Sequence, residues 1–222
     1  MARAIAEGYS LEPGVLTGEE CDALLRALSD STAGRAGTRH LMQNAAVADL
    51  AADPRLLRIA RRFTGAKCTP FRATLFEKTA QANWLIAWHQ DTALPLAERY
   101  EMAGWGPWSE KAGVLYAQAP ASALARVIAL RVHLDSSDAD NGPLRVIPGS
   151  HEAGLLSAEG IRAQVGKLGQ VECCLPKGGI LAMRPLLIHA SSKARTSAPR
   201  RVLHIEYADS LQLAPGIRLA IA

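Results

Sequence analysis

Residues 200–208 read Arg-Arg-Val-Leu-His-Ile-Glu-Tyr-Ala, and this run predicts a β-strand with two unlike faces. Successive side chains of a strand point to opposite sides of a sheet. One side therefore carries Arg200, Val202, His204 and Glu206, and the other carries Arg201, Leu203, Ile205 and Tyr207. The second side is mostly apolar and is expected to pack against helices. The side that begins with Arg200 is therefore expected to line a pocket.

Residues 127–135 divide in the same way. An apolar stripe should face helices, and it consists of Ile128, Leu130, Val132 and Leu134. The opposite face carries Arg131, His133 and Asp135. Polar side chains on the inner face of a barrel strand are typical of a ligand pocket, so Arg131 and His133 are pocket candidates. A solvated sheet face remains an equal alternative, because sheets are often half-exposed.

The rest of the chain separates into a helical part, about 1–66, and a β part, about 70–208, within a single expected domain over 1–222. Thr17 and Glu20 match a capping box and predict a helix over 17–30, and Asp53-Pro54 opens a second helix. Alternating runs separated by turns indicate an all-β sandwich or barrel. The expected strands are 71–78, 84–91, 127–135, 143–148, 171–175, 179–184 and 200–208.

The segment from Pro95 to Pro120 fits neither pattern and is expected to be a long loop. It carries Trp105 and Trp108 between glycines. Long loops inside compact domains are often functional, so a lid is one possibility and a plain connector is the other.

Composition and charge exclude several classes of protein. The formal net charge is +4 and the basic residues are scattered, which gives no support for nucleic-acid or anionic-membrane binding. No apolar run approaches the length of a membrane span, and the first residues lack the pattern of a signal peptide. Four cysteines without Cys-x-x-Cys spacing fit a reducing cytosol. The expectation is a cytoplasmic protein that acts on a small molecule.

A possible metal site begins with Trp88-His89-Gln90-Asp91, where strand alternation places His89 and Asp91 on one face. His-x-Asp alone is a weak signal that arises often by chance. The histidines that could complete the site are His40, His133, His151, His189 and His204. His189 is favoured because it follows a strand and turn that could fold beside His89. Two imidazoles and one carboxylate leave open positions, as in Fe(II) oxygenases.

A 2-oxo acid that chelates such a metal has a distal carboxylate still to be held. A buried guanidinium does this best, because its planar fork matches both oxygens. Arg200 and Arg201 are the candidates, and the alternation of residues 200–208 favours Arg200.

These residues and motifs resemble the phytanoyl-CoA dioxygenase family of 2-oxoglutarate oxygenases. The resemblance covers roughly residues 70–208 and is carried, in order, by Trp88-His89-Gln90-Asp91, the run 140–151 (Asp-Asn-Gly-Pro-Leu-Arg-Val-Ile-Pro-Gly-Ser-His), the run 184–191 (Arg-Pro-Leu-Leu-Ile-His-Ala-Ser) and Arg200. The run 140–151 is more diagnostic than the metal ligands. The resemblance implies a mainly β fold, a cupin-like double-stranded β-helix or jelly roll, backed by N-terminal α-helices.

The resemblance also implies the site. It assigns Fe(II) to His89, Asp91 and His189, and the distal carboxylate of 2-oxoglutarate to Arg200, eleven residues after His189. Further contacts with 2-oxoglutarate are implied for Gln90, Ser191, Arg131 and Thr74, although family members often have an aromatic residue where this chain has Arg131.

The expected reaction consumes O₂ and 2-oxoglutarate, releases succinate and CO₂, and hydroxylates a C–H bond. Related chains that halogenate lack the ligating carboxylate, whereas Asp91 is present here. From position alone, the substrate candidates are Trp105, Trp108, His133 and His204. Two alternatives stay open: a cupin-like metalloenzyme that does not use 2-oxoglutarate, and a β-helix binding module without turnover.

Overall fold

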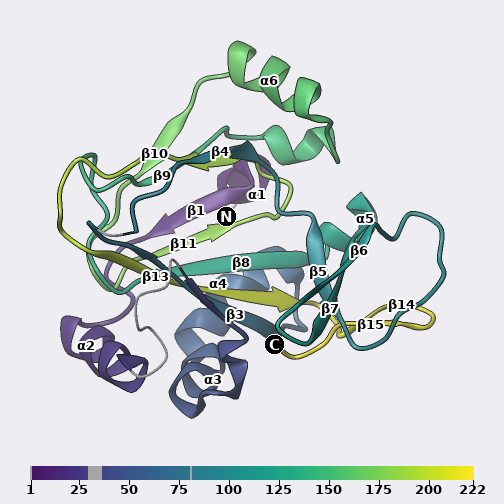
Figure 1. Ribbon diagram of the computed structural model, residues 1–222, viewed down its shortest axis with the longest axis horizontal. Coiled ribbons are helices and arrows are strands. Elements are labelled where there is room, and N and C mark those ends of the chain that lie inside the picture. The colour runs from purple at the N-terminus through teal and green to yellow at the C-terminus, as the bar shows by residue number, and fades with distance from the viewer. Residues whose placement is uncertain (1, 30–36, 81) are drawn as a thin grey trace.

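Two antiparallel sheets face each other at the centre of the computed structural model, which describes residues 2–29, 37–80 and 82–222 (Figure 1). The larger sheet has the order β1 (Tyr9–Glu12), β11 (Ile180–Met183), β8 (Val127–His133), β13 (Arg200–Ala208), β3 (Thr69–Lys78), β2 (Gly37–Arg39). The smaller has the order β10 (Val171–Cys173), β9 (Leu144–Val146), β12 (His189–Ser191), β4 (Ile86–His89). This is the double-stranded β-helix that the resemblance implied.

Three helices cover the outer face of the larger sheet (Figure 1): α2 (Gly18–Ala27), α3 (Ala45–Ala51) and α4 (Pro54–Thr64). The Thr17 side chain accepts from the Glu20 amide and the Glu20 side chain accepts from the Thr17 amide, which confirms the capping box. Asp53 caps α4 through the Arg55 amide, with Pro54 at the first helical position, as predicted. Residue 30, the expected end of the first helix, lies outside the described residues.

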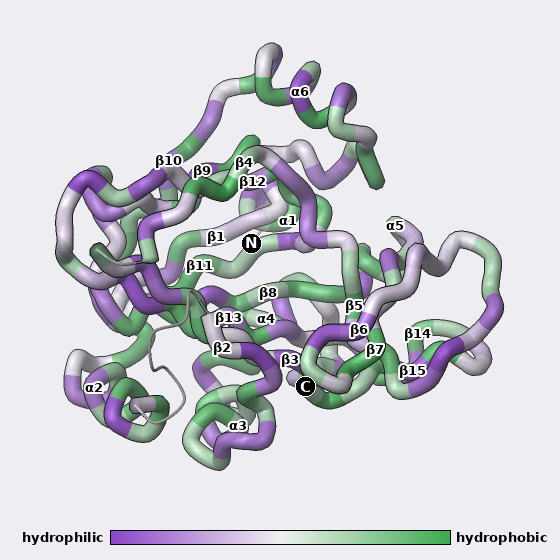
Figure 2. The backbone as a smooth tube through the Cα atoms, viewed as in Figure 1, coloured by the Kyte–Doolittle hydropathy of each residue, from purple (hydrophilic) through white to green (hydrophobic). Residues whose placement is uncertain are grey.

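The predicted alternation of the two long strands is confirmed. Leu203, Ile205 and Tyr207 of β13 join the core beneath the helices, and the Tyr207 hydroxyl donates to the Ala51 carbonyl of α3 at 3.1 Å. The apolar stripe of β8 lies in the same core. Figure 2 shows β8 and β11 as hydrophobic strands in the middle of the molecule. On the opposite face, β8 and β13 carry polar side chains that include Arg131, Arg200 and His204, whereas Leu181 and Met183 of β11 join a third apolar cluster.

The segment 95–120 differs from the expected loop, and that expectation was wrong over much of its length. Three antiparallel strands occur there in the order β5 (Ala93–Leu96), β7 (Val114–Gln118), β6 (Trp108–Lys111). Trp105 and Trp108 pack against a second core cluster that includes Leu94 and Leu96. Burial of these apolar side chains stabilises a small three-stranded sheet that the weak alternation of its sequence did not reveal.

Shorter elements complete the structure: α1 (Ala2–Glu7), η2 (Leu41–Gln43), α5 (Ala121–Leu124), η3 (Ser150–Ala153), α6 (Ala158–Lys167), β14 (Gln212–Ala214) and β15 (Ile217–Arg218). None of the helices in the described part of the chain is long and apolar enough to cross a membrane.

Candidate active site

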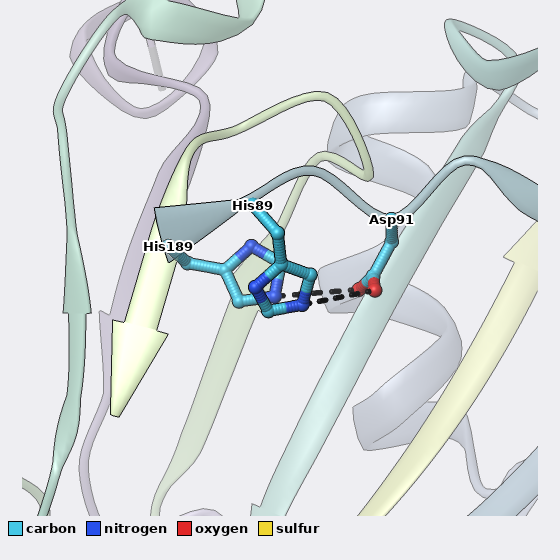
Figure 3. Close-up of side chains that lie close together, drawn as sticks. All are labelled: His89, Asp91 and His189. Carbon is cyan, nitrogen blue, oxygen red and sulfur yellow. Dashed lines mark ion pairs between the residues drawn. The ribbon is translucent and has the colours of Figure 1, made fainter. Parts of the chain in front are cut away.

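Two neighbouring strands of the smaller sheet bring His89, Asp91 and His189 together (Figure 3). His89 ends β4, His189 begins β12, and the two residues are register partners in the antiparallel pair. Asp91 follows β4, where its amide donates to the Pro185 carbonyl at 2.9 Å. Its carboxylate oxygens lie 3.7 Å from His89 Nε2 and 3.6 Å from His189 Nε2. One potential ligand atom from each residue lies within 4.8 Å of the others, a spacing that a single cation can bridge.

Backbone carbonyls fix the orientation of both imidazoles. His89 Nδ1 lies 2.9 Å from the Ala87 carbonyl oxygen, and His189 Nδ1 lies 2.9 Å from the Leu187 carbonyl oxygen. A carbonyl only accepts, so each Nδ1 carries a proton, and each Nε2, which faces Asp91, is the nitrogen available to a metal. Histidine ligands of metals are usually held by such a bond from the opposite ring nitrogen.

The charges of the three groups also suit a cation. Burial lowers the pKa of His189 to about 4, although Asp91 opposes this shift, so the ring is neutral at neutral pH. Burial disfavours the charged form of Asp91, yet His189, His204 and nearby cations outweigh it and hold its pKa well below the usual range. A neutral His189 and an ionised Asp91 are the protonation states that metal ligation requires of these two groups.

The turn that carries the Pro-Gly-Ser-His motif supports the strand that carries His189. Ser150 Oγ accepts from the Ile188 amide at 2.9 Å, and the Ile147 amide donates to the Ile188 carbonyl at 3.0 Å. Ser150 is buried, so this bond is shielded from water. The motif therefore holds the backbone of Ile188, and so helps to position His189, the next residue.

A cavity of about 230 Å³ opens beside the three candidate ligands, between the two sheets. Its walls combine apolar side chains with several cations. The lining consists of Arg72, Thr74, Phe76, Glu77, Lys78, Trp84, Ile86, His89, Asp91, Arg131, Leu144, His189, Ser191, Arg200 and His204. The expected pocket residues Thr74, Arg131, Ser191, Arg200 and His204 are all brought together here.

Arg200 lies in this cavity with most of its hydrogen-bonding capacity unused. It is 4% exposed, and among the described residues its Nε and Nη1 have no partner. Its Nη2 donates to Ser191 Oγ at 3.4 Å, and burial lowers its pKa to about 10. A buried guanidinium with free donors is costly unless a ligand satisfies it.

Lys78 is a second buried cation of the site, and the sequence analysis missed it. It is the register partner of Arg200, and its ammonium donates to Ser191 Oγ at 2.7 Å and to the Ser192 carbonyl. Burial, followed by repulsion from Arg200 and Arg131, lowers its pKa to about 8. The alternation of residues 71–78 could have identified Lys78 as a pocket residue, because Arg72 and Lys78 share a face of the strand with Thr74.

The Asn-Gly turn of the family motif packs against Lys78 and Ser191, two residues that line the cavity. Gly142 has a φ of +71°, and its carbonyl accepts from Ser191 Oγ at 2.9 Å. A Cβ at Gly142 would lie 2.4 Å from the Ser192 carbonyl oxygen and 3.0 Å from Lys78 Nζ. Only glycine lets the turn approach the Lys78–Ser191 pair so closely.

Arg131 and His204 form a neighbouring pair on β8 and β13. Arg131 Nη1 lies 3.1 Å from His204 Nδ1, and its guanidinium lies over the Phe76 ring, 5.3 Å from the centroid. The His204 ring meets Phe76 edge-on, with centroids 5.8 Å apart. Phe76 therefore holds both side chains in place beside the candidate metal ligands.

Other expected site residues lie elsewhere or are already engaged. Gln90 donates to the Gly154 and Leu186 carbonyls at 2.8 and 2.7 Å and accepts from the Leu156 amide at 3.0 Å, so both amide protons are used. His133 is buried and does not line the cavity. Trp105 and Trp108 are also absent from its walls.

Comparisons with known proteins agree with this geometry. The family model for phytanoyl-CoA dioxygenase matches residues 6–202. No curated protein sequence matches the chain. Among solved structures, EctD from S. alaskensis with 2-oxoglutarate and 5-hydroxyectoine has a TM-score of 0.71 at 21% identity, over 93% of this chain and 74% of that one.

Two further structures have the same fold. The non-haem α-ketoglutarate-dependent epimerase SnoN from nogalamycin biosynthesis has a TM-score of 0.68 at 19% identity, over 95% of this chain and 81% of that one. AviO1 from Streptomyces viridochromogenes has a TM-score of 0.65 at 20% identity, over 99% and 95%.

Fold, candidate ligands and family match together define a non-haem iron oxygenase that depends on 2-oxoglutarate. Because the family model covers most of the sequence, the chain belongs to the phytanoyl-CoA dioxygenase family.

Proposed function

We propose that His89, Asp91 and His189 bind Fe(II), and that Arg200, Lys78 and Ser191 bind the distal carboxylate of 2-oxoglutarate. The observation that carries this proposal is the unsatisfied Arg200 guanidinium in the same cavity as the three candidate ligands. No ion pair joins Arg200, Lys78 or Arg131 to a carboxylate anywhere in 2–29, 37–80 or 82–222. A dicarboxylic co-substrate would supply the missing anion.

Bound Fe(II), with 2-oxoglutarate and O₂, supplies the oxidation of a C–H bond together with the release of succinate and CO₂. The chain would orient the co-substrate, supply positive charge for its carboxylate and provide an apolar wall to the cavity. Arg200 and Lys78 would hold one end of 2-oxoglutarate so that its other end lies at the metal ligands. Phe76, Trp84 and Ile86 line the same cavity with apolar surface, which would help to exclude water once the site is filled.

The substrate is proposed to be a small organic molecule, and hydroxylation is the proposed outcome because Asp91 completes the ligand set. Thr74, Arg131 and His204 complete the proposed contacts with co-substrate or substrate. A cytoplasmic location belongs to the same proposal, since all four cysteine thiols are free, as in reducing compartments.

An anaerobic titration tests the proposal. Fe(II) followed by 2-oxoglutarate should produce a metal-to-ligand charge-transfer band, and O₂ should then yield succinate. A cupin-like enzyme that does not use 2-oxoglutarate would bind the metal and give no such band. A binding module without turnover would give neither the band nor succinate.

A further inference from the structure

A second cavity, of about 300 Å³, lies next to the first and shares Arg72, Thr74, Phe76 and Asp91 with it. Its remaining lining includes Arg39, Lys111 and Tyr116. A third, of about 230 Å³, shares Arg39, Thr74 and Phe76 with the second. The space beside Asp91 therefore continues outward past Arg39 and Lys111.

The charges of this second cavity do not cancel. Arg72 is paired with Glu206, and Asp91 is a proposed ligand of the metal. Arg39 and Lys111 take part in no ion pair with any described residue. Two positive charges are thus left unpaired around a cavity that reaches the proposed metal site, which attracts an anion.

The backbone conformation places Arg39 and Lys111 at the second cavity. His40, directly after Arg39, has a φ of +61°, and its Nε2 lies 3.1 Å from the Tyr116 hydroxyl. That contact ties the end of β2 to β7. Lys111 ends β6 beside the tight turn of Ala112 and Gly113, both with positive φ. Its ammonium lies over the Tyr116 ring, 4.9 Å from the centroid.

We infer that Arg39 and Lys111 bind an anionic group of the substrate, a carboxylate or a phosphate, and thereby determine which molecules are oxidised. This inference deepens the proposed function and rests on it. With the anionic group held at Arg39 and Lys111, the remainder of the substrate would extend past Phe76 toward Asp91. The Arg200 subsite stays available for 2-oxoglutarate, because Arg200 does not line the second cavity.

Calorimetric titration of the anaerobic protein, loaded with Fe(II) and saturated with 2-oxoglutarate, tests this inference. Saturation prevents the probes from binding at Arg200. Phenylphosphate and phenylacetate serve as anionic probes and 2-phenylethanol as the neutral one, because Phe76 offers an aromatic wall. We expect either or both anions to bind about tenfold or more tightly than the alcohol, and less tightly as salt is added. The tighter anion identifies the preferred group.

Arg39→Ala and Lys111→Ala should each weaken the binding of that anion about three- to tenfold, and the double variant should remove the preference over 2-phenylethanol. Both side chains are exposed, so the fold should survive, as an unchanged charge-transfer band would verify. The charge-matched control replaces Arg162 and Lys167 on α6 by alanine, and it should bind the probes like the parent.

Equal affinities for the charged and neutral probes would overturn the inference. Anion binding that is unaffected by both substitutions, or reduced equally in the α6 control, would overturn it as well. If the charge-transfer band itself fails to form in the parent protein, the proposed function fails instead, so the two failures are distinguishable.

Discussion

His189 lies directly opposite His89 in the antiparallel pair of β12 and β4, with the ring centroids 4.2 Å apart and the ring planes tilted by 51°. Strand pairing alone therefore brings two imidazoles from distant parts of the chain into contact. Asp91 lies within 4 Å of both Nε2 atoms and completes the group.

Removal of Asp91 should abolish metal binding while the fold is retained. Asp91→Ala removes the one carboxylate that balances the charge of a dication, so Fe(II) affinity should fall by more than about 100-fold, beyond the usual effect of losing an outer partner. Equilibrium dialysis under argon measures this. Asp49→Ala, at an exposed position on α3, is the control. Retained affinity in Asp91→Ala would remove this residue from the ligand set.

Arg200→Ala should act on 2-oxoglutarate rather than on the metal. Loss of one partner of a buried charge pair should raise the KM for 2-oxoglutarate roughly 30-fold or more. Fe(II) affinity should not change. Succinate release against co-substrate concentration measures the effect, and Arg58→Ala on the exposed side of α4 is the control. A parent-like KM in Arg200→Ala would contradict the proposed carboxylate contact.

Gly142→Ala should destabilise the protein far more than Gly14→Ala. Both glycines have positive φ, +71° and +67°, so both substitutions carry the left-handed strain of about 1 kcal/mol. Only at Gly142 would the new Cβ overlap a backbone atom, which adds about 1–3 kcal/mol. Urea denaturation of the two variants gives the difference. Equal losses would show that the turn can move away from Ser192.

Acid should weaken the fold partly through His133. Burial lowers its pKa to about 3, from a usual value of 6.5, so the unfolded chain takes up the proton first. The stability that neutral His133 contributes is complete above pH 6.5 and declines as the pH falls toward 3. Over that window His133→Leu should flatten the pH dependence of the unfolding free energy by up to about 1.4 kcal/mol per pH unit. Parallel curves for parent and variant would contradict this role.

Long strands with alternating polar and apolar residues could be predicted from the sequence. Very short strands, and strands that depend on contacts with distant segments, could not. The boundaries predicted for 200–208 agree with β13, whose nine residues present a clean two-face pattern. β12 has only three residues and follows a turn, so no periodicity could identify it. The small sheet of β5, β7 and β6 depends on burial against distant residues such as Leu213 and Ile217, which the local pattern does not contain.

The residues of the candidate site also divide into those that local sequence could predict and those that depend on contacts with distant segments. His89, Asp91, His189 and Arg200 could be proposed from spacing and motif, because each occupies a position with a recognisable local signature. Lys78 ends a strand and resembles an ordinary surface lysine, but the approach of the Asn-Gly turn buries it to 1% exposure. Contacts between segments more than a hundred residues apart decided its role.

Each imidazole of the proposed metal site is hydrogen-bonded to the backbone carbonyl two positions earlier in its own segment. No distant side chain is required to choose which nitrogen bears hydrogen. Substitutions in the surrounding pocket can thus change the substrate of the enzyme and leave the orientation of both imidazole rings unchanged. This local hydrogen bonding would let the proposed iron-binding geometry persist while the substrates of related enzymes diversify.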